Sequence, residues 1–128
     1  MKRFTIVASL ILAGGIGYGV ATLAQQAGGD KADPVKVDPK HYKVEFENEK
    51  VRVLRISYGP GEKSVMHYHP SGVAVYLTDG KTRMTTPDGK STVTDSKAGT
   101  SAWAPAGSHL PQNMGDKHFE VVLVELKK

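Results

Sequence analysis

Turn-forming residues recur at intervals of about ten positions through the second half of the chain, and this spacing restricts the fold more than any other feature. Glycine and proline gather at residues 59–61, 70–72, 80, 87–89, 99, 105–107 and 111–115. A long helix does not fit between such closely spaced turns, whereas short strands do. Residues 41–128 also contain ten valines against five leucines and one isoleucine, and β-branched side chains favour strands.

Several of these segments show the hydrophobic pattern of a strand. Apolar and polar residues alternate over residues 42–46, which predicts a half-buried strand. Residues 51–58 and 118–126 predict two further strands. Residues 73–78 are apolar at nearly every position, as in a strand that is covered on both faces.

Two Asp-Gly dipeptides predict tight hairpin turns. Asp79-Gly80 and Asp88-Gly89 can both supply the positive φ that such turns require. Together these signals predict a single all-β domain of about eight short antiparallel strands, arranged as a sandwich or small barrel.

Residues 1–24 differ sharply from the rest of the chain. They carry only two charges, on Lys2 and Arg3. A basic start, an apolar run and small residues ending at Ala24 predict a signal peptide that is cleaved after Ala24. An uncleaved membrane anchor is the alternative, since the uncharged residues 4–29 are long enough to span a bilayer. Both interpretations place the domain outside the cytoplasm, in the periplasm or secreted if the source is bacterial.

Residues 25–40 have two prolines, alternating charges and no apolar periodicity, so we expect a flexible linker there and a folded domain over residues 41–128. Cysteine is absent, which excludes disulfides and thiolate zinc sites and is compatible with an oxidising compartment. Removal of residues 1–24 lowers the formal net charge from +4 to +2. The basic residues form no cluster that indicates a nucleic-acid partner.

Histidines carry most of the chemical information in the domain. His67 and His69 are two residues apart in an expected strand, so their side chains face the same side. Two imidazoles in this arrangement can bind one metal ion, and His109 follows a turn at residues 105–108 that can bring a third. The pair alone leaves two interpretations open, a pair of metal ligands or two strand histidines without a metal.

The stretches around these histidines resemble the two motifs of the cupin superfamily. Residues 61–80 resemble the first motif, G-x5-HxH-x3/4-E-x6-G, and residues 99–113 resemble the second, G-x5-PxG-x2-H-x3-N. The resemblance implies a single-domain jelly-roll barrel with a divalent metal in its mouth. Carried over position by position, it implies that the metal ligands are His67, His69 and His109.

The sequence departs from these motifs in two places. Val73 occupies the position of the glutamate in the first motif, and its neighbours Gly72 and Ala74 carry no carboxylate either. In the second motif, one residue fewer separates Gly107 from His109. The first departure leaves the fourth metal ligand open. Histidine donors bind Fe, Zn, Ni, Cu or Mn, so the metal also stays open.

The remaining residues of interest are expected to surround this site or to support the core. Gln112 and Asn113 are expected to orient a histidine from behind by accepting its free N–H. Trp103 is expected in the core or as an aromatic wall for a ligand, His41 in solvent and Glu62 on the surface. Apolar residues expected to share the face of the histidines are Val65, Val73, Val75 and Leu77.

Two functions are compatible with these residues. The resemblance admits a metal-dependent dioxygenase that acts on a small organic substrate, because three histidines leave coordination positions open on the metal. The alternative is a non-catalytic cupin that binds a metal or a small ligand. The resemblance also implies a homodimer, and a sandwich of this size has sheet edges to protect. We expect a membrane contact only if the N-terminal segment is not cleaved.

Overall fold

The computed structural model describes residues 31–128, so the predicted signal peptide or anchor at residues 1–24 lies outside the described residues. One short helix, α2 (Pro34–Val37), precedes the strands. In the described part of the chain, no helix is long and apolar enough to cross a membrane.

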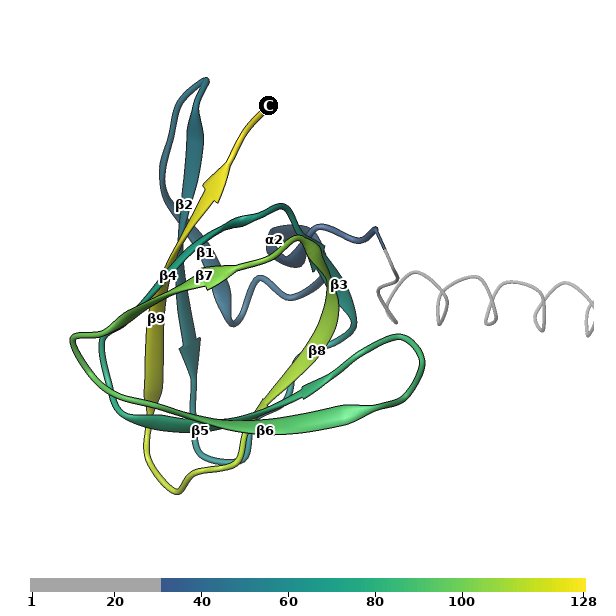
Figure 1. Cartoon of the computed structure of the whole chain (residues 1–128), viewed down its shortest axis with the longest axis vertical. Coiled ribbons are helices and arrows are strands. Elements are labelled where there is room, and N and C mark those ends of the chain that lie inside the picture. Colours follow the sequence, from purple (N-terminus) through teal and green to yellow (C-terminus); the bar gives the residue numbers. More distant parts are fainter. Residues whose placement is uncertain (1–30) are drawn as a thin grey trace, which may run out of the picture.

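The described chain folds into two antiparallel sheets that face each other (Figure 1). The five-stranded sheet has the order β1-β2-β9-β4-β7, and the four-stranded sheet has the order β3-β8-β5-β6. The strands are β1 (Tyr42–Glu47), β2 (Val51–Tyr58), β3 (His67–His69), β4 (Gly72–Tyr76), β5 (Gly80–Thr85), β6 (Ser91–Ser96), β7 (Ser101–Ala104), β8 (Gly107–Asn113) and β9 (Phe119–Leu126). The expected all-β architecture is confirmed, with nine strands where about eight were predicted.

The core lies between the sheets and is built mainly from alternate residues of β2 and β9. Leu54 pairs with Leu123 and Ile56 pairs with Val121 across these two strands, and all four side chains are buried. Burial of an aliphatic side chain of this size contributes about 1.5–3 kcal/mol. Strand β9, which the sequence predicted over residues 118–126, lies at the centre of the five-stranded sheet.

The outer face of the five-stranded sheet carries a row of paired apolar side chains. Val73 pairs with Trp103 on β7 and with Val124 on β9. Ala74, the next residue of β4, points to the opposite face and is buried. Trp103 is 59% exposed, so its expected place in the core was wrong. Val73 and Val75 were also expected on the face of the histidines and lie on the opposite one. Because β4 is apolar at successive positions, its sequence pattern did not indicate which face lies inside.

One of the two predicted Asp-Gly turns is a hairpin, and the other is not. Gly89 has a φ of 85° between β5 and β6, and Thr86 N donates to Lys90 O across the turn. Gly80 instead begins β5 after the chain has crossed from one sheet to the other. A Cβ at Gly80 would lie 2.1 Å from the ring of Phe119, so glycine is needed there for close packing.

The first strand is less buried than its alternation predicts. Tyr42 is 2% exposed, but Val44 is 43% and Phe46 is 54% exposed. The reason is that β1 lies at the edge of its sheet, and its register with β2 shifts between Val44 and Phe46.

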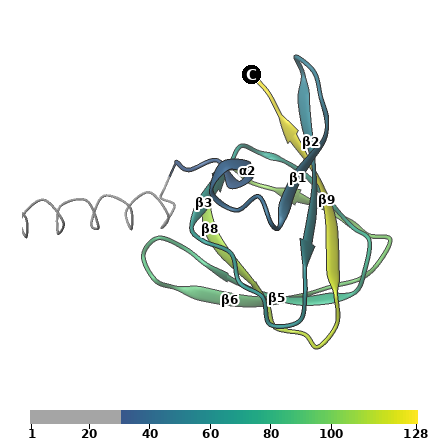
Figure 2. The same ribbon diagram turned by 180° about the vertical axis from the view of Figure 1, so that it is seen from behind.

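The expected flexible linker at residues 25–40 is wrong for its second half. Asp33 caps α2 through a hydrogen bond from Val35 N to its side chain, and Pro34 is buried. The helix packs against β1 and β3, as Figure 2 shows. We call residues 31–41 the N-terminal arm. Its prolines and charges resemble those of a linker, but the charges have long-range partners.

Candidate metal centre

Strands β3 and β8 bring the three predicted histidines together. His67 and His69 lie on one face of β3 and are 0% and 4% exposed, respectively. His109 lies directly opposite His67 in the register of β3 with β8. One ring nitrogen from each histidine lies within 4.8 Å of the others. The same-face spacing predicted for the pair is thus observed, and the turn before β8 brings the third imidazole to it.

The hydrogen bonds of His67 and His69 define which ring nitrogens are free. The Nδ1–H group of His67 donates to Val65 O at 2.8 Å, and that of His69 donates to Glu125 Oε2 at 2.6 Å. In a neutral imidazole with a protonated Nδ1, the Nε2 atom carries a lone pair. Both Nε2 lone pairs are therefore available as metal ligands.

These two free nitrogens face each other. The Nε2 atoms of His67 and His69 lie 3.0 Å apart. Two lone pairs at this distance repel unless a cation lies between them. Ligand bonds of about 2.1 Å at a right angle place two nitrogens about 3.0 Å apart. The donor set therefore fits a divalent metal ion.

The site also keeps two of its three imidazoles neutral. Burial, together with the neighbouring His69 and His67, lowers the pKa of His109 to about 3. Burial and the neighbouring His69 lower the pKa of His67 to about 4. Both side chains are consequently unprotonated near pH 7, which is the form that binds a metal.

A buried carboxylate behind the histidines escaped the sequence analysis. Glu125 is 1% exposed, and its second oxygen accepts a hydrogen bond from Arg52 Nε at 2.7 Å. Burial alone would raise the pKa of Glu125, but the hydrogen bonds from His69 and Arg52 hold it below its usual value. The sequence contains one indication that Glu125 is buried, because it lies two residues after Leu123 on β9 and so shares the inner face of that strand.

Glu125 lies next to the position that lacks the motif glutamate. It pairs with Gly72, whose neighbour Val73 occupies that position. A Cβ at Gly72 would lie 2.0 Å from Val124 O, so no side chain fits there. The carboxylate near the histidines thus comes from β9 rather than from β4, and it binds the Nδ1–H group of His69.

The two amides predicted to orient a histidine do something else. Gln112 Nε2 donates to Gly61 O at 3.3 Å. Asn113 is buried, and its side-chain oxygen accepts a hydrogen bond from Gly115 N. Its amide nitrogen donates to the carbonyl oxygens of Tyr58, Gly59 and Lys117. Both amides therefore hold loops in place, and His67 and His69 are oriented by Val65 O and Glu125.

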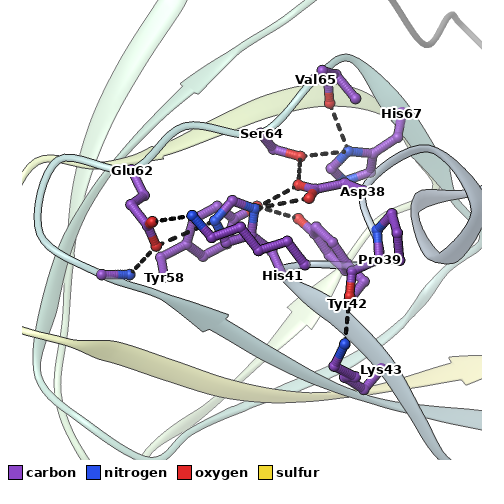
Figure 3. Close-up of polar contacts among 12 residues, drawn as sticks. Asp38, Pro39, His41, Tyr42, Lys43, Tyr58, Glu62, Ser64, Val65 and His67 are labelled. Atoms are coloured by element: carbon purple, nitrogen blue, oxygen red, sulfur yellow. Dashed lines mark hydrogen bonds and ion pairs between the residues drawn. The ribbon is translucent and has the colours of Figure 1, made fainter. Parts of the chain in front are cut away.

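His41 is also placed differently from the prediction, whereas Glu62 lies at the surface as expected, with its side chain 32% exposed. His41 is 6% exposed, and its ring stacks on Tyr58 with the ring centres 4.3 Å apart. Its Nδ1 atom lies 2.7 Å from Asp38 Oδ2, and its Nε2 atom lies 3.3 Å from Glu62 Oε1 (Figure 3). His41 is buried because the N-terminal arm folds back over β2, which sequence spacing alone does not reveal.

A cavity of about 390 Å³ adjoins the histidines inside the barrel. His69 and His109 form part of its wall. None of its lining residues carries a carboxylate, an ammonium group or a guanidinium group. Its aromatic walls come from Tyr42, Tyr58, Tyr76 and Phe119. The cavity therefore suits a small, largely apolar molecule.

Comparison with known proteins identifies the fold. The sequence matches the Cupin domain family over residues 54–125. A cupin domain from Bordetella pertussis Tohama I is 31% identical, with a TM-score of 0.64, over 68% of this chain and 92% of that one. A protein with a double-stranded β-helix domain from Klebsiella pneumoniae subsp. pneumoniae MGH 78578 is 27% identical, with a TM-score of 0.53, over 66% and 70%.

A cupin superfamily protein from Desulfitobacterium hafniense DCB-2 is 15% identical, with a TM-score of 0.51, over 68% of this chain and 76% of that one, which supports the fold alone. No curated protein matches the sequence significantly. The family match covers more than half of the chain, includes all three histidines and agrees with the two-sheet architecture. The chain belongs to the cupin superfamily.

Proposed function

We propose that this cupin binds one divalent metal ion through His67, His69 and His109, and a small organic molecule in the adjoining cavity. The observation that carries the proposal is the 3.0 Å distance between the Nε2 atoms of His67 and His69, with both Nδ1–H groups already donating to oxygen. Such nitrogens are poor partners for each other and good partners for a cation. Imidazole donors accept Fe, Zn, Ni, Cu or Mn, and the proposal is not restricted to one of these metals.

The charge of the site indicates which organic donors would reach the metal. Three neutral imidazoles leave the two positive charges of the ion uncompensated by its ligands. The negative charge of Glu125 is already paired with Arg52 at 2.7 Å. An anionic donor such as a carboxylate, phenolate, enolate or thiolate is therefore favoured at the open coordination positions. The rest of that molecule would contact the apolar walls.

A metal-dependent oxygenase is the first candidate activity. A bound iron or manganese ion would supply redox chemistry with dioxygen at the positions that the histidines leave open. The chain itself contributes the three donors, the orientation of His67 and His69 through Val65 O and Glu125, and largely apolar cavity walls.

Non-catalytic binding is the second candidate, and one observation favours it. The cavity wall offers no carboxylate as a general base. The hydroxyl groups of Tyr42 and Tyr58 bind each other at 2.6 Å, and burial raises the pKa of both phenols. These groups are neutral at ordinary pH, so neither phenol can act there as a general base.

Metal titration of the full chain tests the proposal. The chelator-treated protein would be titrated separately with Fe²⁺ under nitrogen, Mn²⁺, Ni²⁺, Zn²⁺ and Cu²⁺, and the His109→Ala variant would serve as the control. We expect one ion per chain in the wild type and severe loss of affinity in the variant. If none of these ions binds stoichiometrically, the proposal is wrong. Oxygen uptake by the iron form with small thiols and diketones then separates the oxygenase from the binding protein.

We also propose that the domain acts outside the cytoplasm, since residues 1–24 have the composition of a signal peptide. Sequencing the N-terminus of the purified protein tests this. We expect a start at Gln25, whereas Met1 retained in the membrane fraction would support the anchor instead.

A further inference from the structure

We propose that the N-terminal arm is a positioning element of the metal centre, holding His67 and His69 through two separate chains of polar contacts. The inference rests on the metal binding proposed above. It assigns a role to residues 31–41, which lie outside the region of the family match at residues 54–125.

The first chain runs from Asp38 to His67. Ser64 is buried, and its hydroxyl group donates to Asp38 Oδ2 at 2.5 Å. The oxygen of that hydroxyl then faces His67 Nδ1 at 3.4 Å, beside the hydrogen bond from Nδ1 to Val65 O (Figure 3). Because Ser64 gives its only proton to Asp38, it can meet His67 only as an acceptor. Asp38 thereby favours the tautomer in which Nδ1 carries the proton and Nε2 is free.

Asp38 is itself held firmly in the arm. Both of its carboxylate oxygens lie within 2.9 Å of His41 Nδ1, and its backbone N–H caps α2 by donating to Pro34 O. His41 is in turn fixed by the stacked ring of Tyr58. The carboxylate that reaches Ser64 is therefore part of a packed structure and not a solvated surface group.

The second chain runs from Asp33 to His69. The two terminal nitrogens of Arg52 donate to the two carboxylate oxygens of Asp33, each at 3.0 Å. The Nε atom of Arg52 donates to Glu125 Oε1, and Glu125 Oε2 accepts from His69 Nδ1. A guanidinium group is planar, so the fork on Asp33 fixes the direction of the remaining N–H toward Glu125. Asp33 therefore restrains the carboxylate that orients His69.

The arm also contacts the ligand strand directly. Tyr68 N, between the two histidines, donates to Ala32 O at 2.8 Å. The ammonium group of Lys31 lies 5.6 Å from the centre of the Tyr68 ring. Strand β3 has only three residues and lies at the edge of its sheet, where β8 is its one strand partner. The N-terminal arm therefore supplies a second backbone partner to this short edge strand.

Substitutions in the full chain test this inference. Asp33→Asn keeps a side-chain acceptor for the cap of α2 but loses the charge that faces Arg52. Asp38→Asn likewise weakens the acceptor of Ser64. The matched control is Glu45→Gln, which removes an Arg55 ion pair of similar length between β1 and β2, in the other sheet from β3. The probe is Co²⁺, followed by its visible absorption spectrum and by competition with a chelator.

We expect each of the two arm variants to weaken Co²⁺ binding by at least about threefold and to change the absorption spectrum. A direct partner of a metal ligand typically changes affinity 10–100-fold, and the arm acts one contact further away. Glu45→Gln should leave both the affinity and the spectrum unchanged. Asp33→Glu, which restores the carboxylate, should recover much of the affinity and the wild-type spectrum even if Asp33→Asn is less stable.

The outcomes separate this inference from the proposed function. If the wild-type chain binds no Co²⁺ or other divalent ion, both are wrong. If the wild type binds Co²⁺ and both arm variants bind it with the same affinity and spectrum, only the role of the arm is wrong. The role of the arm is equally wrong if Glu45→Gln weakens binding as much as Asp33→Asn does, because the effect would then follow general stability.

Discussion

Glu125 accepts a hydrogen bond from His69 Nδ1 at 2.6 Å, from a position that is 1% exposed. A carboxylate in contact with the outer nitrogen of a metal-binding imidazole fixes the tautomer and increases the basicity of the inner nitrogen. Glu125 can support the metal centre in this way without being a ligand itself, because the candidate ligand group consists of His67, His69 and His109.

The first prediction concerns this carboxylate. Glu125→Gln should lower metal affinity about 10–100-fold, because the His69 Nδ1–H group loses a charged acceptor. It should also destabilise the fold, since Arg52 loses the charge of its partner. Glu120→Gln is the control, because Glu120 lies on the same strand but on the outer face, paired with Ser57. Equal metal affinity in both variants, measured by calorimetry, would contradict the role of Glu125.

The sequence was sufficient to predict the histidine pair but not its surroundings. His67 and His69 follow from a period of two residues in a strand, which local sequence determines. His109 could be placed only through the turn at residues 105–108 and the second motif, because no strand periodicity relates β8 to β3. Glu125 and Arg52 belong to strands that meet only in the folded sheet, so nothing near either residue indicates their contact.

Two expectations failed for physical reasons that recur in small β domains. Val73 lies in a segment that is apolar at successive positions, so the pattern could not distinguish its inner from its outer face. Asp33 lies in a polar, proline-containing segment whose composition is that of a linker. Its place in the fold depends on the fork with Arg52, 19 residues away in the sequence.

The second prediction uses the corrected position of Val73. Val73→Glu should leave metal affinity unchanged, because this side chain lies on the outer face beside Trp103 and Val124. Ala74→Glu, one position along β4, places a carboxylate in the wall of the cavity and should alter metal binding or destabilise the fold. Tighter metal binding by Val73→Glu, measured by competition with a chelator, would show that this face assignment is wrong.

The third prediction concerns the stability of the metal-free protein in acid. The pKa of His67 is lowered to about 4 and that of His109 to about 3, whereas both are near 6.5 in the unfolded chain. The unfolded chain therefore binds more protons below pH 6.5, so the free energy of unfolding falls as the pH falls. The slope is at most about 1.4 kcal/mol per pH unit for each histidine, and it vanishes above about pH 7.

Urea unfolding at several pH values between 5 and 7 measures this slope, in a range above the titration of most carboxylates. The double variant His67→Ala, His109→Ala lacks both groups and should show a flatter dependence, whatever its absolute stability. An unchanged slope in the double variant would mean that these two histidines are not held neutral by burial.

The fourth prediction concerns Thr82, which lines the cavity on β5 and is 6% exposed. Within residues 31–128, its hydroxyl group is the one fully buried side-chain polar group that has no hydrogen-bond partner. A buried hydroxyl without a partner costs about 1–3 kcal/mol, and valine has nearly the same shape. Thr82→Val should therefore leave the free energy of unfolding unchanged or raise it by about 1–2 kcal/mol.

The control for Thr82→Val is Thr85→Val on the same strand. The Thr85 hydroxyl group is hydrogen-bonded to Ser91 at 2.8 Å in an exposed position, so its loss should change stability little or slightly reduce it. Urea unfolding of the metal-free proteins compares the two variants directly. If Thr82→Val is clearly less stable than Thr85→Val, the Thr82 hydroxyl has a partner in solution. In that case a water molecule in the cavity is the simplest explanation, because the cavity wall lies next to this side chain.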